Sequence, residues 1–155
     1  MEIQIYQATT EQDWRLARTL ITQYIDWLDL DLSFQNIDDE FANLEKKYSG
    51  KNGNFYLAKL NNEVVGCIGT RKHSNEECEI KRLFVCDGGK GNGIGKLLIN
   101  TATTEARKQN YKAMLLDTLP KMSAALKLYK EMGFVETSAY CYHPHPKAIF
   151  LKLTL

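Results

Sequence analysis

The segment Lys90–Lys96 constrains the fold of this chain most strongly, because it places three glycines at alternate positions between a strand and a helix. The strand pattern before it covers Glu77–Cys86, and a helical pattern begins at Ile94. Alternate glycines allow a tight turn with unshielded N–H groups, and a helix N-terminus adds the positive end of its dipole. The segment therefore predicts a site for an anion, in particular a pyrophosphate, although a plain tight turn also accounts for the glycines.

Spacing excludes two common pyrophosphate-binding motifs. A P-loop requires glycine where Lys90 stands, and Ser or Thr where Leu97 stands. A dinucleotide fingerprint requires Gly-x-Gly-x-x-Gly, whereas this chain has Gly-x-Gly-x-Gly. A different phosphate-bearing ligand is therefore expected.

Hydrophobic periodicity predicts an α/β fold in which helices cover a mixed sheet. Thr10 and Asp13 form the pattern of a capping box, and Asn61-Asn62 is a candidate hairpin turn. We expect strands at residues 3–5, 54–60, 63–71, 77–86, 113–117, 134–137 and 148–153, and helices at about 11–29, 37–48, 94–102 and 122–132.

Composition agrees with a single domain over residues 1–155, since 44% hydrophobic and 25% charged residues are ordinary for a globular chain. The four cysteines form no C-x-x-C pair, so we expect neither a zinc site nor a disulfide framework, and a reducing cytoplasm fits best. Neither a signal peptide nor a membrane span is expected. The net charge of +1 argues against a nucleic-acid binder.

Two segments together resemble the acetyl-CoA-binding motifs of the GNAT N-acetyltransferase superfamily. The first joins Glu79–Val85 to Lys90–Gly95 and is similar to the signature Gln/Arg-x-x-Gly-x-Gly/Ala, with lysine at the first position. The second is Ala125–Phe134, which contains a tyrosine at 129, although Met122 stands where many members have asparagine. The order of predicted elements extends the resemblance over the whole chain. It implies a single-domain mixed sheet of six to seven strands flanked by about four helices.

The resemblance implies transfer of acetyl from acetyl-CoA, as co-substrate, to a primary amine of a small molecule or peptide, by direct attack in a ternary complex. It makes Glu79 the candidate general base and Tyr129 the candidate acid, and it implies no metal. Lys96 or Arg107 would meet the ribose phosphate. The residues implied to contact the cofactor are Leu83, Phe84, Val85, Lys90, Gly91, Asn92, Gly93, Ile94, Gly95 and Lys96.

Alternatives stay open at each of these positions. Glu79 is equally explained as a sheet residue paired with Lys81 or Arg71, and Tyr129 as a core aromatic. The same fold would also serve a non-catalytic acyl-CoA-binding module, and an atypical glycine turn would serve a nucleotide-binding protein. The two histidines of His143–Pro146 lack a nearby third ligand, so we expect a loop near the acceptor mouth rather than a metal site.

Charge is distributed unevenly along the chain. Residues 19–45 contain seven acidic residues and no Lys or Arg, so the remaining residues carry 20 basic and 12 acidic side chains. Solvated helix faces account for such a segment. We nevertheless expect it to attract a small cationic amine as the acceptor. A homodimer stays open. The acidic side chains are Asp26, Asp29, Asp31, Asp38, Asp39, Glu40 and Glu45.

Overall fold

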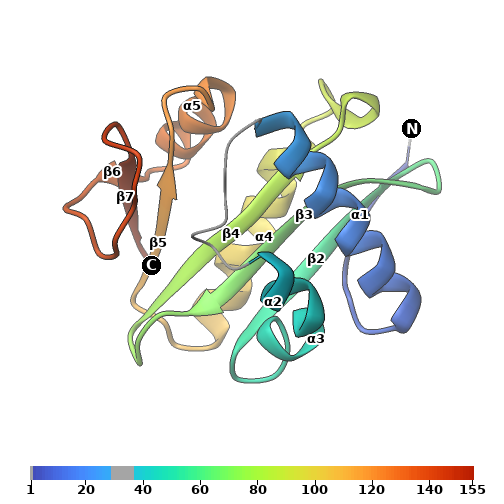
Figure 1. The fold of residues 1–155 in the computed structure, drawn as a ribbon, viewed down its shortest axis with the longest axis horizontal. Coiled ribbons are helices and arrows are strands. Elements are labelled where there is room, and N and C mark those ends of the chain that lie inside the picture. Colours follow the sequence, from blue (N-terminus) through green and yellow to red (C-terminus); the bar gives the residue numbers. More distant parts are fainter. Residues whose placement is uncertain (1, 29–36) are drawn as a thin grey trace.

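The computed structural model describes residues 2–28 and 37–155, which form one mixed sheet with helices on both faces (Figure 1). The sheet has seven strands in the order β1-β2-β3-β4-β5-β7-β6. Neighbouring strands are antiparallel except for β4 and β5, which run parallel. The α/β prediction is confirmed.

The observed elements lie close to the predicted ones. The strands are β1 (Ile3–Gln7), β2 (Gly53–Leu60), β3 (Glu63–Lys72), β4 (Glu77–Val85), β5 (Ala113–Thr118), β6 (Val135–Glu136) and β7 (Ile149–Thr154). The α-helices are α1 (Glu11–Leu28), α2 (Ile37–Ala42), α3 (Leu44–Lys47), α4 (Ile94–Lys108) and α5 (Ser123–Glu131), and a short 3-10 turn, η2, covers Asp87–Gly89.

Local sequence signals explain where these elements begin and turn. The Thr10 hydroxyl accepts from the Asp13 N–H, and the Asp13 carboxylate accepts from the Thr10 N–H, which completes the predicted capping box of α1. Asn61 and Asn62 both have positive φ, as a two-residue hairpin turn requires. The single helix predicted over residues 37–48 is wrong in one respect, since Asn43 separates α2 from α3 with a φ of −123°.

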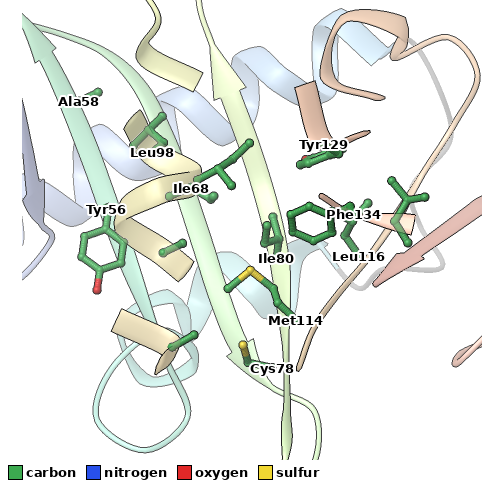
Figure 2. Packing of buried hydrophobic residues seen from close by; sticks show 14 of the residues in the cluster. Tyr56, Ala58, Ile68, Cys78, Ile80, Leu98, Met114, Leu116, Tyr129 and Phe134 are labelled. Carbon is green, nitrogen blue, oxygen red and sulfur yellow. The ribbon is translucent and has the colours of Figure 1, made fainter. Parts of the chain in front are cut away.

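Two apolar clusters lie on opposite faces of the sheet. One packs α1, α3 and the preceding loops onto β2 and β3 around Trp14, Phe55 and Leu57. The other packs α4 and α5 onto the central strands, and Figure 2 places Ile80, Met114 and Tyr129 in this cluster. Side chains of α5 therefore reach the β4–β5 region from one side while α1 approaches it from the other.

The parallel strands β4 and β5 pair over only a short length. Their register joins Glu77–Glu79 to Ala113–Leu115, and beyond these residues the two strands diverge (Figure 1). Residues 80–85 therefore have no partner strand on the side that faces β5. A register shift between Cys67 and Gly69 on β3, together with a φ of +59° at Arg82, bends β4 in the same region.

Candidate active site

The divergence of β4 and β5 opens two adjoining cavities. The first has a volume of about 300 Å³ and lies between β4, the end of β5 and the loop His143–Pro146. The second has a volume of about 430 Å³ and extends past Leu83–Val85 to the glycine turn. Both are lined by Tyr24, Leu83 and Met122, so they form two arms of one site.

The glycine turn presents unpaired N–H groups at the start of α4. Gly91 and Gly93 have φ values of +82° and +73°, and Gly93 is the N-cap of the helix. A Cβ atom on Gly95 would lie 3.1 Å from Leu128 Cδ2, so this glycine allows α4 to approach α5. Within the described part of the chain, the N–H groups of residues 91–96 donate no hydrogen bond. The anion site stays a prediction, and the turn has the free N–H groups that such a site requires.

Most residues predicted to contact a cofactor lie at this second cavity. Its lining includes Leu83, Phe84, Val85, Lys90, Gly91 and Gly95. Asn92 instead fixes the turn, because its amide donates to the carbonyls of Gly89 and Lys90.

Three further residues predicted to contact the cofactor, Gly93, Ile94 and Lys96, do not line this cavity, although Gly93 lies within the glycine turn itself. Ile94 is buried in the core, and Lys96 is exposed on α4. Arg107 lies in the last turn of α4, about 20 Å along the helix from the glycine turn. Of the two basic candidates, Lys96 is therefore the one near the turn.

Tyr129 lines the first cavity from α5 and is 5% exposed. Its ring packs against Phe134 with centroids 5.5 Å apart, so it is also part of the core. Burial raises the pKa of the Tyr129 hydroxyl, and the nearby Tyr24 and Asp117 raise it further. The hydroxyl therefore stays protonated at neutral pH and is able to donate a hydrogen bond.

Glu79 is buried near the first cavity but does not line it. The Tyr140 hydroxyl donates to Glu79 Oε2 at 2.5 Å, and Lys81 Nζ lies 3.4 Å from the same oxygen. Burial raises the pKa of Tyr140, and the Glu79 carboxylate raises it further. Lys81 itself lines the cavity, so the Lys81 side chain stands between Glu79 and the space that an acceptor would occupy.

Sequence reasoning missed Asp117 and the contribution of His143. Asp117 lies on β5 and lines the first cavity, where its Oδ2 is 3.8 Å from His143 Nε2. The predicted strand 113–117 contained Asp117, and a carboxylate at the end of an otherwise apolar strand was the available signal. The loop His143–Pro146 does lie in the cavity wall, near the expected acceptor mouth.

Two of the described acids in the acidic segment form ion pairs within the protein. Glu40 forms a buried ion pair with Arg82, and Asp39 pairs with Lys47 at 2.8 Å. None of the segment's described acids lines either of the two cavities. Asp29 and Asp31 lie outside the described residues.

Residues 2–28 and 37–155 bring together no group of three or more His, Cys, Asp or Glu side chains that would hold a metal ion. Nor does this part of the chain contain a helix with the length and apolar character needed to cross a membrane.

Comparison with known proteins decides the family. The model of the acetyltransferase (GNAT) family matches residues 21–134, which include the glycine turn, both divergent strands and α5. The chain belongs to the GNAT acetyltransferase family. An uncharacterized N-acetyltransferase of Schizosaccharomyces pombe is 32% identical over 155 residues, with 99% of this chain and 95% of the relative covered.

Solved GNAT structures have the same fold. An acetyltransferase from Staphylococcus aureus superposes with a TM-score of 0.82 at 23% identity, covering 99% of both chains. A family member from Elizabethkingia anophelis, solved with acetyl-CoA bound, has a TM-score of 0.66 at 24% identity and covers 99% of this chain and 98% of its own. The sheet and helices described above are thus those of a GNAT acetyltransferase.

This GNAT chain departs from the superfamily pattern at two positions. Lys90 replaces the usual Gln or Arg, and its ammonium lies 2.9 Å from Asp87 at the entrance to the turn. Met122 replaces the common asparagine, lines both cavities and accepts a long contact of 3.6 Å from the Tyr24 hydroxyl. Met122 therefore adds apolar surface where the two arms meet.

Proposed function

We propose that this protein transfers the acetyl group of acetyl-CoA to a primary amine, by direct attack while both are bound. The observation that carries the proposal is the pair of cavities that meet at Tyr24, Leu83 and Met122. One arm reaches the glycine turn and suits a long phosphate-bearing ligand, and the other has the volume for a small acceptor. The bound acetyl-CoA of the Elizabethkingia anophelis relative supports this choice of ligand.

The cofactor would lie along the unpaired edge of β4. The pyrophosphate would accept hydrogen bonds from the N–H groups of residues 91–96. The pantetheine amides would pair with the backbone of Leu83–Val85, whose edge toward β5 is open because strand pairing ends at Glu79. This mode of binding uses backbone groups, so it depends little on the side chains of those three residues.

The reaction has to move two protons. An alkyl ammonium has a pKa of about 10.4, so the amine is mostly protonated at neutral pH. Its first proton must therefore leave before the nitrogen attacks the acetyl carbonyl. The carbon–nitrogen bond then forms, the carbon–sulfur bond breaks, and the nitrogen loses a second proton while the thiolate gains one. One proton is released for each acetyl group transferred.

We assign Glu79 the role of removing the proton from the amine, and Tyr129 the role of stabilising the sulfur of the departing CoA. Glu79 is held by Tyr140 and Lys81 at the edge of the acceptor cavity, so it would take the proton through a water molecule rather than by contact with the amine. The Tyr129 hydroxyl would donate a hydrogen bond to the departing thiolate.

The proposal is tested by incubating the protein with acetyl-CoA and a panel of amines, and by following both free thiol and product mass. We expect thiol release that depends on the amine, together with a product that is heavier by one acetyl group. Acetyl-CoA binding without transfer to any amine would refute catalysis and favour a non-catalytic acyl-CoA-binding module. Competition by ATP or NAD in place of CoA would instead favour a nucleotide-binding protein.

A further inference from the structure

The charged groups around the first cavity are mostly paired with one another. Arg82 is 8% exposed, and its Nε and terminal nitrogen donate to Glu40 at 3.0 and 3.3 Å. Lys81 is paired with Glu79 at 3.4 Å. The two charges within each pair offset one another, so neither Arg82 nor Lys81 offers a full positive charge to a ligand. Asp117 is the carboxylate that remains among the described residues of the wall, and its side chain is 15% exposed.

Two histidines lie beside Asp117 in the cavity wall. His143 Nδ1 accepts from the N–H of His145 at 3.0 Å, and His143 Nε2 lies 3.8 Å from Asp117 Oδ2. His145 Nδ1 accepts from the N–H of Lys147 at 3.1 Å in the same way. Among the described residues that line the cavity, Asp117 is the acidic one. His143 holds one side of the Asp117 carboxylate.

The remainder of the cavity wall is largely apolar and includes Leu28, Ile80, Leu116 and Leu119. Thr118 also contributes to the wall, but its Oγ1 is enclosed by protein and is therefore not open to a ligand. A carboxylate and apolar walls around a space of about 300 Å³ describe a site for a small molecule with one charged end.

We propose that the acceptor is a monoamine with an apolar body, such as an alkyl or arylalkyl amine, and that Asp117 binds its ammonium group. This inference rests on the proposed acetyl transfer and specifies its substrate. Desolvating an ammonium is costly without an opposite charge, which Asp117 supplies. A carboxylate beside the reacting amine would instead meet Asp117 and an apolar wall. A second ammonium would find no second carboxylate among the described residues that line the cavity.

The wild-type protein provides the first test, because phenethylamine and phenylalanine differ only by a carboxylate. We expect the kcat/KM for phenethylamine to exceed that for phenylalanine and for spermidine by at least about 10-fold, which corresponds to about 1.4 kcal/mol. A preference for phenylalanine or spermidine would overturn the inference while leaving acetyl transfer intact. Absence of transfer to every amine would instead refute the proposed function.

The second test compares Asp117→Asn with Asp38→Asn. Asp38 is exposed on α2 and lines neither cavity, so its variant removes the same charge without touching the site. Asp117→Asn should raise the KM for phenethylamine about 10- to 100-fold, as expected for a lost hydrogen bond to a charged group, while kcat changes less. Equal KM values in the two variants would refute the assignment. Unchanged CoA affinity in Asp117→Asn would verify that the variant is folded.

Discussion

The buried pair between Glu40 and Arg82 predicts a large and specific loss of stability. The two side chains are 6% and 5% exposed and join α2 to β4 beside the first cavity. Burial alone would lower the pKa of Arg82, but the Glu40 carboxylate outweighs it and the net pKa is raised. At 3.0 Å the attraction is about 5–6 kcal/mol for an effective dielectric constant of about 20.

Glu40→Ala leaves the Arg82 guanidinium buried without its counter-charge. We expect the free energy of unfolding to fall by about 3–5 kcal/mol, measured by urea denaturation with circular dichroism. Glu11→Ala is the control, because it removes an exposed pair with Arg15 and should cost less than about 1 kcal/mol.

The combined variant Glu40→Met with Arg82→Met separates a stranded charge from lost packing. It should be more stable than Glu40→Ala, since apolar side chains of similar volume replace a buried pair at little cost. A Glu40→Ala loss below about 1 kcal/mol would contradict the reasoning. A double variant less stable than Glu40→Ala would contradict it as well.

Three further predictions concern the site and the first helix. Tyr129→Phe should lower kcat about 10- to 1,000-fold with little change in CoA affinity, and an unchanged kcat would remove Tyr129 from the mechanism. Because the pKa of Tyr129 is raised, the wild-type rate should not fall between pH 7 and about 10 through loss of the Tyr129 proton. Glu79→Gln should reduce the rate most at neutral pH and recover partly at about pH 9–10, where free amine is abundant, whereas an equal loss at every pH would make Glu79 structural. Slight burial acts to raise the pKa of Asp13, but the N–H groups of Thr9 and Thr10 lower it overall. The contribution of Asp13 to stability is therefore fully present above its unfolded pKa of about 3.9 and is lost as the pH falls through the lower folded pKa. Asp13→Ala should accordingly lower the free energy of unfolding by about 0.5–2 kcal/mol at pH 7 and by less at pH 3, measured by denaturation at both pH values.

Local patterns in the sequence were sufficient to predict most of the fold. The capping box at Thr10, the asparagine turn after β2 and the glycine turn before α4 depend on neighbouring residues, so each could be recognised without the tertiary structure. The cofactor arm followed from the same turn together with β4. The positive φ of Gly93 and the unpaired N–H groups beside it agree with the anion site predicted there.

The acceptor arm depends on contacts between distant segments and was harder to predict. The pairing of Glu40 with Arg82 spans 42 residues, and it turned part of an apparently free acidic segment into a structural ion pair. Asp117 lies near His143 in the part of β5 that no longer pairs with β4. Periodicity predicts strands, but it does not predict how far two parallel strands stay paired.

The most direct test of the account is calorimetric titration of CoA into Gly93→Glu and Gly50→Glu. Both glycines have positive φ, +73° and +62°, and a Cβ atom on either would meet nothing within 4 Å, so the two substitutions impose similar backbone strain. Only Gly93 lies at the turn that would hold the pyrophosphate, where a glutamate adds bulk and negative charge. The account predicts that Gly93→Glu abolishes CoA binding in a folded protein while Gly50→Glu binds CoA with wild-type affinity. Wild-type affinity in a folded Gly93→Glu variant would contradict it.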